Sequence, residues 1–195
     1  MATTEPIRDM EELKDFISYY SDRRDEKMER NYVLILTGLY TALRISDVLS
    51  LRWMDVMDEK RASVRDYICV VEKKTKKKRN ILLNRKLKGA LSRFWRRQKP
   101  KASEYIFSSE NDRKKPISRV HAYRVIKEAA NACIHDSENI SCHSLRKTFG
   151  YHALRQGASL AVLTEIFNHS TYEVTKRYLG LTQDDQDDII MRLDF

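Results

Sequence analysis

The sequence predicts an α+β fold that is mostly α-helical, with a small antiparallel β-sheet of about three strands. Apolar residues recur at helical spacing through most of the 195 residues. Only residues 64 to 83 are rich in the β-branched and aromatic residues that favour strands. The length suits one domain with a sizeable core, and the chain shows no internal repeat and no low-complexity linker.

The first part of the chain predicts helices. Asp9 is expected to cap a helix, with Glu12 as its capping-box partner. A buried helix is expected from about residue 26 to residue 40, and Ser46 is expected to cap a short helix after it. Arg44 then falls in the tight connection between these two helices.

The middle of the chain predicts a β-hairpin. Two β-rich runs within residues 64–83 flank the polar turn KKTKKK, and a third strand is expected near residues 53–57. Asn84 is expected to cap a basic helix to about Gln98, which Pro100 stops.

The last third predicts further helices, each beginning at a serine: Ser118, Ser141, Ser159 and Ser170. Gly157 is expected to end the second of these helices. Glu173 lies three residues after the last serine and completes a capping signature there.

Charge is unevenly distributed. The formal net charge is +9, and residues 73–101 contain 14 Lys or Arg and no Asp or Glu. Such a stretch is typical of a polyanion partner, although a solvated helix face would give the same composition. Four aspartates cluster near the C-terminus and are interpreted as a solvated helix start: Asp184, Asp185, Asp187 and Asp188.

Several classes of protein are disfavoured. No apolar run approaches the roughly 18 residues that cross a bilayer, and the N-terminus lacks the apolar core of a signal peptide. Three cysteines without C-x-x-C spacing disfavour disulfides and a zinc ribbon. Cys142, His143 and His152 lack a standard zinc spacing. We therefore expect a cytoplasmic protein without metal or cofactor.

His143 and Arg146 lie three residues apart near the start of one expected helix. The N-terminal end of a helix favours a phosphate, so a histidine beside a guanidinium there is suited to clamp an oxyanion. An arbitrary H-x-x-R is more often a surface pair. The continuation LRKTF and the tyrosine 32 residues past Arg146 favour function here.

Tyr178 is the candidate nucleophile. A phenol has a pKa near 10, so it needs cationic neighbours and a proton acceptor to react. His169 lies nine residues earlier, across one turn, where both side chains can reach one site. Most tyrosines and lone histidines are structural, but the string NHST favours function for this pair.

Arg44 precedes Asp47 by three residues, and an arginine aimed at phosphate needs a carboxylate to fix its fork. Asp47 could fill that role or form a simple ion pair. Arg44 and Arg146 together could hold both non-bridging oxygens of a phosphodiester. Such preorganised donors are each worth roughly 10²–10³ in rate.

One lysine of the hairpin turn could protonate a departing oxygen, while the others contact phosphates. The residues at issue are Lys73, Lys74, Lys76, Lys77 and Lys78. Arg79 and Lys147 are further candidates for DNA contact.

Four separated strings in the right order resemble the tyrosine recombinases, the phage-integrase family of DNA strand-exchange enzymes. TALRISD resembles the family's first arginine string, and HSLRKTF matches its H-x-L-R-x-T-F box. The sequence FNHSTYEVTKRY matches the box with histidine and tyrosine, with Phe167-Asn168 in place of the usual Leu-Gly. The K-T of the hairpin turn points to Lys74. The resemblance covers roughly residues 32–182.

The resemblance implies a site-specific recombinase that integrates, excises or inverts DNA of mobile elements. It implies that Tyr178 forms a 3′-phosphotyrosyl bond and frees a 5′-hydroxyl. Arg44 and Arg146 would stabilise the transition state with His169, and His143 would act as acid and base. Lys74 would protonate the leaving oxygen.

The implied partners are double-stranded DNA, a homo-tetramer on paired sites and accessory DNA-bending proteins. The implied location is the cytoplasm, in association with the nucleoid, for a protein encoded by a bacterium or a phage. We expect a helical lead-in over residues 1–25, a catalytic domain over 26–182, and a tail over 183–195 that contacts a subunit. Most members carry a further helical domain before the catalytic one. A naturally short member and an excised fragment both fit.

Two other functions use the same features. A type IB topoisomerase would nick and rejoin DNA with the same residues and without pairing of sites. A DNA-binding accessory or regulatory protein would keep the fold without activity, which the filled catalytic positions argue against.

Overall fold

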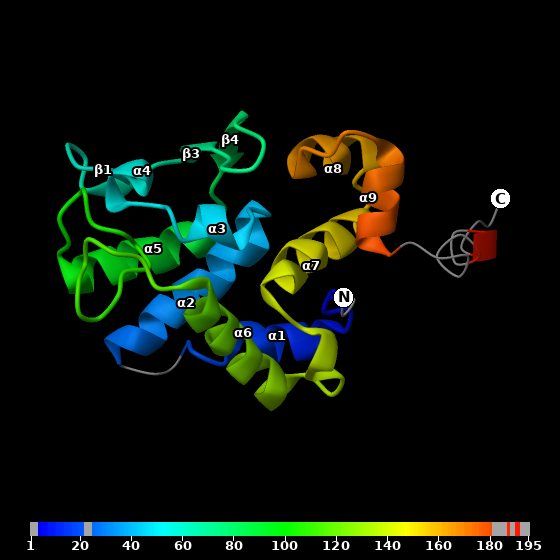
Figure 1. The fold of residues 1–195 in the computed structure, drawn as a ribbon, viewed down its shortest axis with the longest axis horizontal. Helices are drawn as coiled ribbons and strands as arrows, with labels where there is room; N and C mark the ends of the chain where they lie inside the picture. Colours follow the sequence, from blue (N-terminus) through cyan, green and yellow to red (C-terminus); the bar gives the residue numbers. More distant parts are fainter. Residues whose placement is uncertain (1–3, 22–24, 181–186, 188–189, 192–195) are drawn as a thin grey trace.

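One buried helix, α2 (Glu26–Thr41), organises the main body of the molecule (Figure 1). Its residues from Val33 to Leu36 are completely buried, and it packs against the helices α1, α5, α6 and α7. The computed structural model describes the chain except for residues 1–3, 22–24, 181–186, 188–189 and 192–195. Most of the acidic cluster near residue 186, and most of the expected tail, therefore lie outside the described residues.

The other helices agree with the predicted α+β class: α1 (Met10–Ser18), α3 (Ile45–Val48), α4 (Trp53–Val56), α5 (Arg85–Gln98), α6 (Arg119–Cys133), the 3₁₀ turn η1 (Ser137–Asn139), α7 (Cys142–Arg155), α8 (Leu160–Phe167) and α9 (Tyr172–Leu179). The strands are β1 (Met57–Asp58), β2 (Ser63–Val64), β3 (Tyr67–Val71) and β4 (Lys78–Leu82).

The strands form two antiparallel pairs, β1 with β2 and β3 with β4. In the second pair Tyr67 lies opposite Leu82 and Val71 opposite Lys78, which confirms the predicted hairpin. Alternate residues of β3 are buried, as the period of two in a strand requires. This hairpin holds the KKTKKK turn at one end of the main body (Figure 1).

The prediction of a strand over residues 53–57 was wrong for most of its length. Residues 53–56 form the helical turn α4, and only Met57 begins a strand. Trp53, Val56 and Met57 are buried while Met54 is exposed, which is helical rather than alternating spacing. The carboxylate of Asp55 accepts the N–H of Arg52, and the N–H groups of Trp53 and Met54 donate to carbonyls of residues 104 and 102, so local and distant contacts together fix this turn.

Most predicted helix starts are confirmed by side-chain caps. The side chains of Asp9, Asn84, Ser118, Ser141 and Ser159 each accept a hydrogen bond from a backbone N–H in the first turn. These bonds satisfy donors that a helix N-terminus leaves unpaired.

Three capping predictions were wrong. The helix α3 begins after Arg44 rather than at Ser46. The helix α9 is capped by Thr171, whose Oγ1 accepts the Val174 N–H, rather than by Ser170. Glu12 forms no box with its helix cap, and its carboxylate instead accepts the N–H of His135. For Glu12 a tertiary contact replaced the local signal, whereas α3 and α9 begin within two residues of the predicted caps.

The buried apolar residues of the described chain form two clusters. The larger cluster fills the main body, where Trp53 packs at a ring-centroid distance of 5.5 Å from Phe94. The smaller cluster joins Ala42, Leu163, Phe167 and Leu179 and underlies the lobe formed by α8, α9 and the end of α7. Figure 1 shows this lobe facing the β3–β4 hairpin. The junction between lobe and main body contains the predicted site.

Gly150 of α7 allows the lobe to pack closely, because a Cβ added there would lie 2.5 Å from side-chain atoms of Leu179 and Phe167. We predict that Gly150→Ala destabilises the fold by about 1–3 kcal/mol, the usual cost of overpacking a core. Urea denaturation should show a lower midpoint. Gly89→Ala in α5 is the matched control, because its Cβ meets nothing within 4 Å, and it should leave stability unchanged or higher. Equal midpoints for both variants would contradict this packing.

Candidate active site

Glu72, directly after β3, is the acceptor at the centre of the junction. Its side chain is fully buried and accepts hydrogen bonds from Arg44 at 2.7 Å, Arg79 at 3.0 Å, Thr75 at 2.9 Å and Asn168 at 3.2 Å. Burial alone would raise the pKa of Glu72, but these donors outweigh it and lower the pKa to about 2. The carboxylate is therefore a fixed negative charge.

Arg44 lies where the chain turns between α2 and α3. Ala42 ends α2 in the left-handed conformation, with φ of 52°, and this turn directs Arg44 toward the hairpin. Its Nη1 donates to Glu72, and its side chain keeps 18% of its surface exposed. Arg44 is thus held on one side and open on the other, as a phosphate-binding arginine must be.

The expected partner of Arg44, Asp47, is placed differently. Asp47 is buried, and its Oδ1 accepts the backbone N–H of Lys73 at 3.0 Å. It therefore fixes the backbone at the start of the hairpin turn rather than the guanidinium. The prediction that Asp47 orients Arg44 was wrong, because Glu72 occupies that position.

Arg146 spans the junction from the first turns of α7. Its guanidinium donates to the carbonyl of Ala42 at 2.5 Å and to the carbonyl of Phe167 at 2.5 Å, and it lies 4.8 Å from the ring centroid of Phe167. Burial lowers its pKa to about 10, which still leaves it charged at pH 7. Two neutral acceptors hold this charge without cancelling it, so it can attract an anion.

His143 lies on α7 one turn before Arg146, as predicted from the H-x-x-R spacing. Partial burial of its ring, with the positive charges of Arg146 and Arg44, lowers its pKa. A neutral imidazole at pH 7 can accept a proton.

Tyr178 lies on α9 with its hydroxyl turned inward. The hydroxyl is buried and has no hydrogen-bonding partner among the described residues. Burial raises its pKa, while the positive charges of Arg146 and Arg44 act in the opposite direction. A buried polar group without a partner is uncommon in native proteins and needs an explanation, of which a catalytic role is one.

His169 packs beside Tyr178, with ring centroids 5.1 Å apart. Its Nδ1 pairs with the hydroxyl of Thr175 at 3.0 Å, which leaves Nε2 for a ligand. Burial and the neighbouring arginines lower the pKa of His169 to about 4. The structure thus brings together the arginines, one histidine and the tyrosine that the sequence singled out.

The hairpin lysines lie on the exposed turn and at the start of β4. The positive charge of Lys74 contributes to the lowered pKa values of both His143 and His169. The proposed contact residues Lys73, Lys76, Lys77 and Lys78 are exposed.

Two proposed DNA contacts are engaged elsewhere. Arg79 is paired with Glu72 and keeps 14% of its side chain exposed. Lys147 donates from Nζ to the carbonyl of Thr4 and lies 5.4 Å from the ring centroid of Tyr178. Both charges thus have a partner within the protein, and contact of either residue with DNA stays a prediction.

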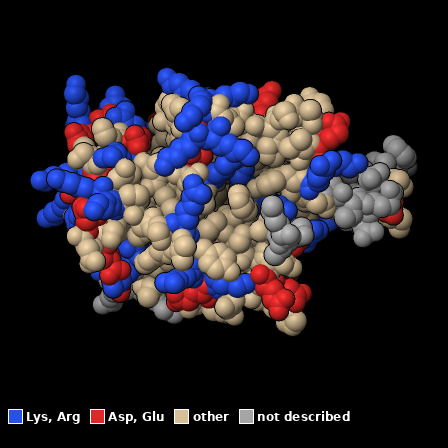
Figure 2. Space-filling view, viewed as in Figure 1, with Lys and Arg blue, Asp and Glu red and all other residues tan. Residues whose placement is uncertain are grey.

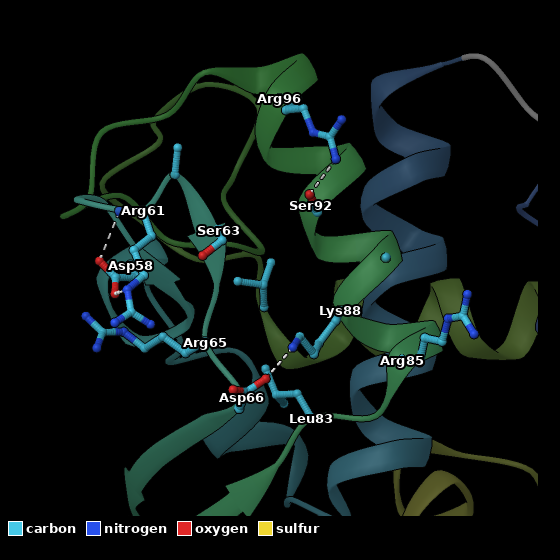
Figure 3. A pocket seen from close by; sticks show the side chains of 13 residues that line it. Asp58, Arg61, Ser63, Arg65, Asp66, Leu83, Arg85, Lys88, Ser92 and Arg96 are labelled. Carbon is cyan, nitrogen blue, oxygen red and sulfur yellow. Dashed lines mark hydrogen bonds and ion pairs between the residues drawn. The ribbon is translucent and has the colours of Figure 1, made fainter.

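Basic side chains gather over the hairpin and toward the α5 end of the face seen in Figure 2. Away from the junction, a hollow of about 920 Å³ lies between the β1–β2 turn and α5 (Figure 3). Four arginines and one lysine line it, and two of these cations pair with acids: Arg61 with Asp58, and Lys88 with Asp66. This hollow is a second basic surface and not part of the tyrosine site.

Among the described residues, no group of three or more His, Cys, Asp or Glu side chains could hold a metal ion. The described part of the chain also contains no helix that is long and apolar enough to cross a membrane.

Sequence reasoning missed Glu72, Thr75 and Asn168. Glu72 is separated by 28 residues from Arg44 and by 96 from Asn168, so only the folded chain brings them together. One signal was available: Glu72 is the acid that immediately precedes the long basic stretch.

Known proteins resemble this chain along nearly its whole length. The model of the phage integrase family matches residues 8–184. The chain is 40% identical over 184 residues to the probable integrase/recombinase YoeC of Bacillus subtilis (strain 168), covering 94% of this chain and 93% of that protein. It is 28% identical to the tyrosine recombinase XerD of Rickettsia bellii (strain RML369-C), covering 90% of this chain and 59% of that protein.

Solved structures share the fold. The crystal structure of XerA recombinase superposes with a TM-score of 0.76 at 21% identity, covering 98% of this chain and 67% of that chain. XerH site-specific recombinase bound to palindromic difH substrate has a TM-score of 0.76 at 17% identity, covering 98% of this chain and 54% of that chain.

The low pKa of Glu72 gives a pH prediction. Its folded pKa of about 2 lies below its ordinary 4.5, so its contribution to stability is complete above the ordinary value and is lost as pH falls through the folded value. The difference in unfolding free energy between wild type and Glu72→Gln should be constant above about pH 5 and shrink toward pH 2. Denaturant titrations at each pH measure it. Glu165→Gln, on the exposed face of α8, controls for the loss of one charge, and a difference that stays constant down to pH 2 would contradict the assignment.

Proposed function

Because the chain belongs to the phage integrase family, an enzyme class that cleaves and rejoins DNA, we propose that it is a site-specific recombinase with Tyr178 as its nucleophile. One observation carries the proposal: the hydroxyl of Tyr178 is buried without a partner among the described residues, beside two arginines. Integration, excision and inversion all use this chemistry. Residues 26–182 would form the catalytic domain.

The scissile phosphate binds between Arg44 and Arg146. Arg44 offers its open side, while Glu72 holds the other side of its guanidinium. Arg146 is fixed by two carbonyls and retains its charge. Neither arginine needs to move far to meet the negative charge that develops on the non-bridging oxygens of the phosphate, and such preorganised charge usually contributes more to rate than any other single effect in catalysis.

Tyr178 attacks phosphorus through its phenolic oxygen, and the bond from phosphorus to the 5′-oxygen breaks. Since burial raises its pKa, the tyrosine is protonated until it reacts, and its proton must leave during attack. His143 accepts this proton, because its lowered pKa keeps it neutral at pH 7. His169 assists by donating to the phosphate.

Lys74 donates a proton to the departing 5′-oxygen. The 5′-hydroxyl of a partner strand then attacks the phosphotyrosyl bond, and the proton transfers run in reverse. The phosphodiester bond is thereby conserved without an external energy source.

Double-stranded DNA is the proposed partner. The exposed hairpin lysines supply phosphate contacts, which give affinity and register more than sequence preference. XerH, a structural relative, is described as bound to its difH substrate. We further propose a tetramer on paired sites, assisted by DNA-bending proteins, acting at the nucleoid in the cytoplasm.

Tyr178→Phe removes one hydroxyl, so it should abolish covalent DNA attachment and leave DNA affinity within about twofold. SDS-resistant complexes with supercoiled and nicked DNA from the gene's flanking region, formed in EDTA, measure attachment. Tyr172→Phe is the matched control, because Tyr172 is exposed at the start of the same helix, and it should retain attachment. Attachment that persists in Tyr178→Phe, or that is lost in both variants, would count against Tyr178.

The role of Lys74 is tested by changing the leaving group. Lys74→Ala should slow cleavage by roughly 10²–10⁴-fold, the usual contribution of a general acid. A substrate with sulfur in place of the bridging 5′-oxygen needs no proton to depart, so it should restore the rate of this variant. Lys76→Ala, two residues along the same turn, should show little loss and no rescue. Rescue of Lys76→Ala instead would reassign the acid.

A further inference from the structure

Asn168 occupies the turn between α8 and α9, immediately before His169. Its backbone is left-handed, with φ of 52° and ψ of 45°, a conformation that glycine and, less often, asparagine adopt without large strain. The family motif that the sequence resembles has glycine at this position. A glycine would satisfy the backbone, so the asparagine side chain needs a separate explanation.

The side-chain amide of Asn168 crosses from the lobe to the hairpin. Its Nδ2 lies 2.8 Å from Thr75 Oγ1 and 3.2 Å from Glu72 Oε2. Thr75 also donates to Glu72 at 2.9 Å. The amide thus closes a small network with two hairpin residues, and glycine could form neither contact.

The same network reaches Arg44. Oε2 of Glu72 accepts both the Asn168 amide and Nη1 of Arg44. Lys74 lies between Glu72 and Thr75 in the sequence, so both anchors of the amide flank it in the turn.

The backbone next to Asn168 is held independently by Arg146, which donates to the carbonyl of Phe167. The short segment 167–169 is therefore fixed from two directions, and it leads directly to His169. The hairpin side and the lobe side of the site meet at this segment.

We propose that Asn168 is a positioning residue that locks the β3–β4 hairpin against the α8–α9 segment, with Glu72 as the shared acceptor. It aligns Lys74 and Arg44 on the hairpin side with His169 and Tyr178 on the lobe side. Its effect on cleavage rests on the proposed function, whereas the lock itself does not.

Two substitutions separate the amide from the backbone turn. Asn168→Gly keeps the left-handed turn and removes both hydrogen bonds. Asn168→Asp keeps the shape but places a carboxylate against Glu72, and only its protonated form can donate as the amide does. A residue that merely completes the turn would tolerate glycine and show no dependence on pH.

With single-turnover cleavage of nicked DNA, Asn168→Gly should lower the cleavage rate by roughly ten- to a hundredfold, as misalignment of reacting groups does, with DNA affinity unchanged. Asn168→Asp should lose more at pH 8 and recover, relative to wild type, as pH falls toward 5. A wild-type rate in Asn168→Gly, or equal losses of Asn168→Asp at both pH values, would overturn the proposal.

A double-mutant cycle tests the lock without DNA. The effects of Glu72→Gln and Asn168→Gly on the unfolding equilibrium constant should deviate from additivity by roughly fivefold, because the residues share a hydrogen bond. Glu72→Gln with Asn131→Ala, on distant α6, should be additive. If the wild-type protein never attaches covalently to DNA, the proposed function is refuted. The double-mutant cycle then still tests the contact between the hairpin and the α8–α9 segment. Additive effects of the Glu72 and Asn168 changes would refute that contact.

Discussion

The junction must hold two partly or fully buried guanidinium groups, those of Arg44 and Arg146, without cancelling their positive charge. The other contacts of the site depend on this constraint. A guanidinium removed from water needs acceptors, and a full counter-charge on each would leave nothing for a substrate. The chain uses one carboxylate, Glu72, for Arg44 and Arg79 together, and neutral carbonyls for Arg146. The remaining positive charge helps burial to lower the pKa of His169 to about 4 and opposes the effect of burial on Tyr178.

The site lies between two packed bodies rather than within one. Arg44 and Glu72 belong to the main body, while His169 and Tyr178 belong to the lobe on the smaller apolar cluster. Arg146 and the amide of Asn168 bridge the two. The geometry of catalysis therefore depends on contacts that also hold the lobe, so packing and chemistry are linked through a few residues.

Local sequence signals made much of the fold and of the candidate site predictable. Helix caps, the β-rich runs around a lysine turn and the H-x-x-R spacing depend on neighbours in sequence, and they located most elements and candidate residues. Glu72 was missed because a buried counter-charge is defined by residues far along the chain. Asp47 was predicted to orient Arg44 because the two residues are close in sequence. The helical turn of residues 53–56 was missed because part of what holds its backbone, the carbonyls of Ala102 and Glu104, lies far along the chain.

The most direct test identifies the residue that carries DNA. Covalent complexes would be trimmed with nuclease, digested with trypsin and analysed by mass spectrometry. Cleavage after Lys176 and Arg177 separates Tyr178 from Tyr172, so the two tyrosines report independently. The account predicts a nucleotide on the peptide that begins at Tyr178. A nucleotide on any other residue would contradict it.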